Sequence, residues 1–242
     1  MPWSLMMILL AAPAGAQTTA FTGTLAEADR LYFSRNEPGN LDRAEQILRQ
    51  RLGMREDEPA LWRLSRCLIR EGEREKKKSK KIDLFKEAEM SALRAVELDP
   101  KDAQAHFILG FAYGRRGQTQ GIMHSLFLVG PIRKEMEAAL ALDPNHGGAY
   151  HILGELYRQL PRMAGGSKVQ GLAYLEKALA AAPNNTSVHC DLAEAYLDAG
   201  KKDEARAVLE RLPAVKTPDD PAEFPDDVAQ ARKLLETLKN PG

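Results

Sequence analysis

The stretch HFILGFAY, residues 106–113, decides the fold because it recurs as YHILGELY at 150–157 and as HCDLAEAY at 189–196. Each copy opens with a histidine or a tyrosine. A leucine, a glycine or alanine, and a tyrosine follow three, four and seven positions later. This spacing places the four side chains on one stripe of an α-helix. The small residue of each stripe lets a second helix approach closely, and these residues are Gly110, Gly154 and Ala193.

Each copy is preceded by another helical stretch that ends at a proline. Pro100 follows AVELD, Pro144 follows ALALD and Pro183 follows ALAAA. Because proline cannot continue a helix, each of them marks a helix end. The alternation of the two stretches predicts five helical hairpins, at roughly 24–54, 58–100, 102–144, 146–183 and 185–212.

These features together resemble the tetratricopeptide repeat, whose pattern is W-x2-L-G-x2-Y, then A-x3-F, then P. The second half of that pattern is matched by Ala88, Ala92, Ala95 and Pro100. The fullest single match consists of Leu192, Ala193, Tyr196, Gly200 and Ala205. Trp62 stands at the family's tryptophan position, although Ser65-Arg66 replaces the Leu-Gly pair behind it. The resemblance covers residues 17–212 and implies an all-α solenoid of hairpins.

The two ends of the chain do not show the repeat pattern. Leu5–Ala12 is an apolar run too short to span a bilayer, and the small residues of a signal-peptidase site follow at Ala14 and Ala16. We expect residues 1–16 to be a signal peptide and the mature protein to be periplasmic or secreted, without a lipid anchor. A chance apolar N-terminus is the alternative, since no Lys or Arg precedes the run. Residues 213–225 form a Pro/Asp-rich linker, and 226–239 a helix that caps the last repeat.

Composition agrees with an all-α protein and excludes several classes of function. The chain has 34 Lys and Arg residues in total and 34 Asp and Glu residues in total. It therefore lacks the net positive charge that is typical of nucleic-acid-binding proteins. No phosphate loop, G-x-S-x-G or H-E-x-x-H motif is present, so we expect a protein without catalytic activity or cofactor. Two cysteines, Cys67 and Cys190, lie three hairpins apart, and we expect free, buried thiols.

Three histidines bear on metal binding. His106 and His189 occupy the stripe positions and are expected to pack between helices. His151 and Glu155 form an i, i+4 pair that could hold a metal ion, but no third ligand is evident, so no metal site is expected.

The hairpins depart from the family period of about 34 residues. Pro100 to Pro144 spans 44 residues and Pro144 to Pro183 spans 39, so we expect insertions between paired helices. These insertions are Arg70–Lys81 (REGEREKKKSKK), Gly121–Ile132 (GIMHSLFLVGPI) and Leu160–Ser167 (LPRMAGGS). The lysine run could meet an anionic membrane surface or an acidic partner, or could be a solvated loop or helix extension.

Partner binding is the function that a tetratricopeptide solenoid implies, through side chains of the first helix of each hairpin. The apolar insertion either packs on the solenoid or lines its groove, where it would cover Phe107 and Phe111. We expect a protein or peptide segment as partner, with a hydrophobic small ligand as the alternative. The candidate binding residues are Arg63, Phe107, Phe111, Leu126, Phe127, Leu128, His151, Glu155 and Glu194.

A narrower resemblance lies in LPRMAGGS at 160–167, followed by YLEKAL at 174–179. This stretch is similar to the exported tetratricopeptide components associated with TRAP-type transporters. It implies an alternative role as a periplasmic ligand-binding accessory of solute uptake, although the lipid-anchoring cysteine of those proteins is absent. A cell-envelope assembly factor is a further alternative.

Overall fold

The computed structural model describes residues 23–239, and within that range the chain is helical and contains no strand. The expected signal peptide lies outside the described residues. The α-helices are α1 (Leu25–Phe33), α2 (Asn40–Met54), α3 (Glu58–Arg74), α4 (Lys78–Leu98), α5 (Ala103–Gln120), α6 (Ile122–Leu142), α7 (Gly147–Gln159), α8 (Lys168–Ala181), α9 (Thr186–Asp198), α10 (Lys202–Arg211) and α11 (Phe224–Lys239). Two short 3-10 turns, η1 (Arg162–Ala164) and η2 (Leu212–Ala214), complete the described part of the chain.

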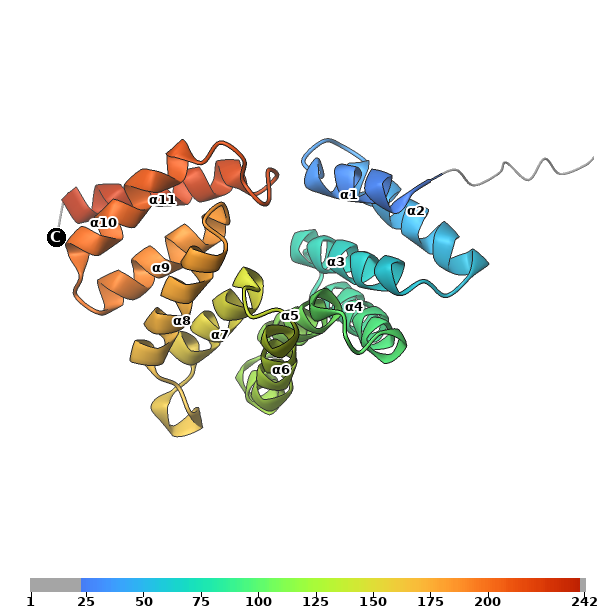
Figure 1. Cartoon of the computed structure of the whole chain (residues 1–242), viewed down its shortest axis with the longest axis horizontal. Helices are drawn as coiled ribbons and strands as arrows, with labels where there is room; N and C mark the ends of the chain where they lie inside the picture. The colour runs from blue at the N-terminus through green and yellow to red at the C-terminus, as the bar shows by residue number, and fades with distance from the viewer. Residues whose placement is uncertain (1–22, 240–242) are drawn as a thin grey trace, which may run out of the picture.

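The predicted all-α solenoid of five hairpins is confirmed, and α1–α2, α3–α4, α5–α6, α7–α8 and α9–α10 form the pairs. Figure 1 shows the pairs following one another around an arc, with the first helix of each pair on the inside. α11 packs against α9 and α10, and its Ala231 is fully buried there. This helix begins two residues earlier than the sequence predicts.

Side-chain caps explain where several helices begin. The Thr24 side chain accepts a hydrogen bond from the amide of Glu27, and Asp57 and Asp102 do the same for the amides of Ala60 and Gln104. Each cap satisfies an amide that has no partner within its own helix. The hairpin boundaries are therefore set by local chemistry.

The small residues of the repeated stripe lie where paired helices touch, as predicted. A Cβ atom added to Gly154 of α7 would lie 2.7 Å from Cγ of Leu175 in α8. One added to Gly110 of α5 would collide with the Met136 side chain in α6. Ala193 is fully buried. The repeat register read from the sequence is correct at these positions.

Two of the expected insertions are helical extensions, which corrects the prediction of a loop at Gly121–Ile132 and settles the charged insertion as the helix extension that was one of its two alternatives. α3 continues to Arg74 and α4 begins at Lys78, so the charged insertion supplies helix ends and a short turn. α5 and α6 are separated only by Gly121, whose φ of 109° is a conformation that glycine adopts readily. Glu, Lys, Arg and Leu favour helix, so the extra residues lengthen the hairpins instead of leaving them. The third insertion is a turn that contains η1.

No helix within residues 23–239 combines the length and the apolar character needed to cross a bilayer.

Candidate functional site

The inner face of the solenoid is formed by α1, α3, α5, α7 and α9, each of which contacts the next (Figure 1). Six of the nine predicted binding residues belong to these helices: Arg63, Phe107, Phe111, His151, Glu155 and Glu194. The structure divides them into an aromatic and arginine-rich group on α1, α3 and α5, and a charged group on α7 and α9.

Arg63 lies in the first group, where Asp29 and Trp62 hold its guanidinium. Its Nε atom is 3.0 Å from both carboxylate oxygens of Asp29, and its guanidinium lies 4.0 Å from the centre of the Trp62 ring. Arg66 shares the same carboxylate at 2.6 Å and stacks 3.8 Å from the Tyr32 ring. Arginines fixed over aromatic rings present planar, oriented donors to a partner.

Phe107 and Phe111 are one turn apart on α5, the first helix of the middle hairpin. Their rings stack nearly parallel, with centroids 6.1 Å apart. His146 lies 4.8 Å from the Phe107 ring, and the Arg115 guanidinium lies 5.0 Å from the Phe111 ring. Both phenylalanines are half-buried, so part of each ring remains open to a ligand.

His151, Glu155 and Glu194 lie in the second group, and each already has a partner. His151 Nε2 is 2.6 Å from a carboxylate oxygen of Asp191. Arg158 donates to Glu155 at 2.8 Å and to Glu194 at 3.2 Å. Hydrogen bonding to Glu155 raises the pKa of Arg158 further above its already high value. The candidate pair of His151 and Glu155 is thus divided between two ion pairs, and no group of three metal-ligating side chains occurs within residues 23–239.

Leu126, Phe127 and Leu128 lie on α6, the second helix of its hairpin, and not on the inner face. Phe127 is 76% exposed and Leu126 37% exposed, so the expected covering of Phe107 and Phe111 by these two side chains is wrong. Leu128 packs against the core cluster around Ile132, which Phe107 also contacts. The physical reason is the helix itself, because a helix can bury only one of its faces against the solenoid.

The cysteines and the two stripe histidines belong to the interior, as predicted. Cys67 and Cys190 are both free and buried, and burial raises the pKa of each thiol to about 12. His106 pairs with Glu135 at 2.6 Å between α5 and α6. His189 is 4% exposed and bonds the carbonyl of Asn185. None of these groups is presented to solvent as a reactive centre.

A contact between the two ends of the solenoid was missed by the sequence reading. The return loop, residues 215–223 between η2 and α11, reaches the first hairpin (Figure 1). Two nitrogens of Arg35 donate to the two carboxylate oxygens of Asp220, each at 2.7 Å. Arg70 lies 2.5 Å from a carboxylate oxygen of Glu223, whose pKa is raised mainly by burial. The Asp and Pro content of this segment indicated a linker and gave no sign of its partner.

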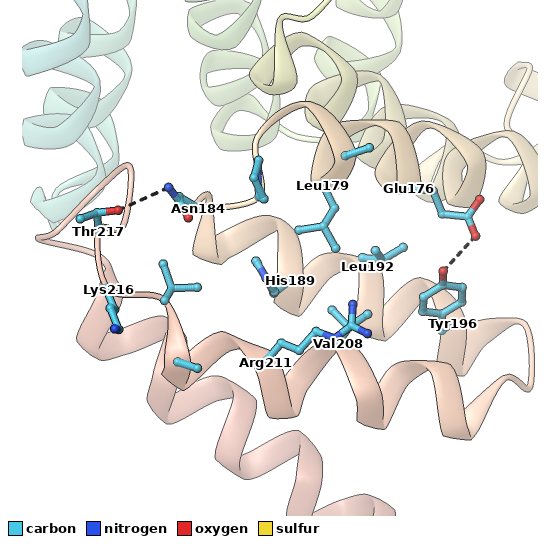
Figure 2. Close-up of a pocket in the computed structure, with 14 residues that line it drawn as sticks. Glu176, Leu179, Asn184, His189, Leu192, Tyr196, Val208, Arg211, Lys216 and Thr217 are labelled. Carbon is cyan, nitrogen blue, oxygen red and sulfur yellow. Dashed lines mark hydrogen bonds between the residues drawn. The ribbon is translucent and has the colours of Figure 1, made fainter.

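A pocket of about 690 Å³ lies outside the inner face, between α8, α9, α10 and η2. Figure 2 shows His189 near its centre and Leu179, Leu192 and Val208 around it. Its edges are tied by the Tyr196 hydroxyl donating to Glu176 at 2.9 Å and by Asn184 donating to Thr217 at 3.4 Å. Burial lowers the pKa of His189, which favours a neutral ring.

Solved structures support the fold. A thermophilic tetratricopeptide protein of Thermus thermophilus, TTC0263, superposes with a TM-score of 0.67 at 20% identity, over 88% of this chain and 100% of the other. PilF of Pseudomonas aeruginosa superposes with a TM-score of 0.54 at 18% identity, over 90% of this chain and 94% of the other. At these identities the likeness establishes a tetratricopeptide fold.

No curated protein sequence matches the chain. A family described as regulator of microtubule dynamics protein 1-3 matches residues 24–239, which is nearly the whole of the described range. The chain therefore belongs to the regulator of microtubule dynamics protein 1-3 family.

Proposed function

We propose that this protein is a non-catalytic interaction module that binds a segment of a partner protein on its inner face. The observation that carries the proposal is the Phe107–Phe111 pair, half-buried at the middle of that face and flanked by Arg115. Aromatic and arginine side chains in partly formed pockets contribute most of the binding energy in protein interfaces.

The chemistry around this pair supports binding rather than catalysis. Cys67 and Cys190 are both buried with raised pKa values, which disfavours the thiolate that a nucleophilic cysteine needs. A rigid array of paired charges suits recognition of an oriented segment. The family description, regulation of microtubule dynamics, is a role exercised through contacts between proteins.

We also propose that residues 1–16 direct export, on the strength of the apolar run and of Ala14 and Ala16. Mass spectrometry of the protein from its native host should then find Gln17 as the N-terminal residue. Recovery of the intact Met1 terminus would rule export out. The uptake alternative rests on LPRMAGGS and the following YLEKAL, since neither the matched family nor the two compared structures is described as a transporter component.

Site-specific photo-crosslinking tests the binding proposal. A photoreactive phenylalanine analogue at Phe111 should capture a discrete partner in the native host, whereas the same analogue at the exposed Phe127 of α6 should not. Both variants keep an aromatic ring, so the comparison isolates the face of the molecule. Equal capture at the two positions, or none at Phe111, would refute binding on the inner face.

A further inference from the structure

The return loop occupies a carboxylate-binding site that the first two hairpins build. Arg35 lies in the turn between α1 and α2 and is only 4% exposed. Its guanidinium donates two hydrogen bonds of 2.7 Å to the carboxylate of Asp220. Arg70 of α3 approaches Glu223 at 2.5 Å. Asn36 donates to the backbone carbonyl of Ala222 at 2.6 Å. Arg35, Asn36 and Arg70 thus contact two carboxylates and the backbone carbonyl that lies between them in the sequence.

The receiving side chains are held in place without help from the loop. The Arg35 guanidinium lies 4.6 Å from the centre of the Tyr32 ring. Arg70 donates to the Tyr32 hydroxyl at 3.1 Å, and Arg74 donates to the carbonyl of Arg35 at 2.9 Å. Tyr32 itself is 3% exposed. None of these contacts uses a residue of the return loop.

Charge makes an empty site unfavourable. Within the described residues, the carboxylates that pair with Arg35 are Asp220 and Glu223, both from the return loop. Removing them would leave a nearly buried guanidinium without a counter-charge, which is strongly destabilising. The site needs carboxylates, but nothing in its geometry requires that they come from this chain.

The loop buries little surface of its own, so its attachment depends mainly on the charged contacts, which another carboxylate-bearing segment could replace. Among its residues 215–223 only Ala222 is buried, and the side chains of Asp220 and Glu223 are 22% and 31% exposed. Because both carboxylates are reached by solvent, added salt weakens their pairing with the arginines, although Arg35 itself is nearly buried. The loop's advantage is its attachment at both ends, to η2 and α11, which gives it a high effective concentration. An incoming segment with the same chemistry would replace the same contacts.

We propose that Arg35, Asn36 and Arg70 form a receptor for an acidic, extended segment of a partner protein with Asp-x-x-Glu spacing, and that the return loop is its built-in competitor. This inference rests on the proposed function, because it assigns a chemical class to the partner segment. Binding of that segment would release the contact between the two ends of the solenoid.

The test uses the loop's own sequence as the probe. A labelled peptide TPDDPAEF, corresponding to residues 217–224, is titrated by fluorescence anisotropy into the parent and into the Asp220→Asn/Glu223→Gln variant. The neutral peptide TPNNPAQF is the matched control. We expect the variant to bind the acidic peptide at least tenfold more tightly than the parent does, with affinity falling as salt is raised and no binding of the neutral peptide.

A second variant covers the case in which the first does not fold. Eight Gly/Ser residues inserted between Val215 and Lys216 keep every ion pair but lower the loop's effective concentration, and should also increase peptide binding. A folded variant that binds acidic and neutral peptides equally would overturn the receptor. This inference fails if neither loop variant binds the acidic peptide. The proposed function still stands in that case if a protein carrying Arg70→Gln forms the same crosslink at Phe111 as the parent.

Discussion

The close crossing of α7 and α8 makes a prediction about glycine that helix propensity alone would get wrong. Gly154 and Gly171 face each other at this crossing, since a Cβ on Gly171 would lie 2.8 Å from the carbonyl oxygen of Gly154. A Cβ on Gly154 would lie 2.7 Å from Cγ of the fully buried Leu175 and 3.1 Å from the carbonyl oxygen of Gly171. The perturbation is Gly154→Ala.

Gly114, in the middle of α5, is the matched control. The nearest atom to an added Cβ there is Cδ1 of Ile132, at the ordinary contact distance of 4.0 Å. Alanine is favoured over glycine by about 0.8–1 kcal/mol inside a helix, so Gly114→Ala should gain roughly that amount. Gly154→Ala gains the same propensity but must displace Leu175 or part the helices, and such overpacking costs about 1–3 kcal/mol. The expected net effect at Gly154 is between neutral and about 2 kcal/mol destabilising. Gly154→Leu should be worse.

Thermal and urea unfolding of the three proteins, followed by far-UV circular dichroism, measures the difference. For a chain of this size about 1 kcal/mol shifts the melting temperature by roughly 2–4 °C, so the two alanine variants should separate clearly, with Gly114→Ala above the parent and Gly154→Ala at or below it. If Gly154→Ala stabilised the protein as much as Gly114→Ala, α7 and α8 would not cross at these glycines. The repeat register would then be wrong.

Three further outcomes are expected. Burial, followed by the neighbouring Glu45, raises the pKa of the Glu71 carboxyl to about 8. The folded protein therefore holds this proton more tightly than the unfolded chain does. The resulting stabilisation is complete below the unfolded pKa and is lost as the pH rises through about 8. Glu71→Gln should therefore melt with the parent below pH 4, under the unfolded pKa of 4.5, and above the parent at pH 9, and a gap independent of pH would contradict this. Cys67 and Cys190 should resist a thiol reagent in the native protein and yield two equivalents after unfolding, whereas fast native reaction would show that they are accessible. Phe127→Asp should change stability by no more than about 0.5 kcal/mol, since the side chain is 76% exposed, and a large loss would place Phe127 in the core.

The hairpins could be predicted from the sequence because everything that specifies them is local. The stripe at 106–113, the proline after each second helix and the caps at Asp57 and Asp102 all act within about one or two helix turns. The apolar insertion was misread as a loop because the family period was taken to limit helix length, and for the charged insertion a loop and a helix extension were both left open. REGEREKKKSKK consists mostly of residues that favour helix, and its composition was the better guide.

The inner face could be predicted only in part. Register assigned Arg63, Phe107 and Phe111 to the first helices of their hairpins, where they lie, but register does not say which charges of successive hairpins meet. His151 and Asp191 are 40 residues apart, and their pairing depends on the tilt between α7 and α9. Such a pairing is a property of packing between hairpins and not of spacing along the sequence.

The contact of the return loop depends on the whole solenoid at once. Asp220 is 185 residues from Arg35, and the small rotations at every junction between hairpins must add up to bring the two together (Figure 1). In an open solenoid each unit contacts only its neighbours, so the first and last units are energetically independent. Here the ion pairs of Arg35 and Arg70 with the return loop join the two ends. Their geometry therefore depends on the curvature of every hairpin between those ends. A ligand that straightens or tightens the inner face would strain Arg35 against Asp220, and so binding at Phe107 and Phe111 would be felt at the return loop without any contact between them.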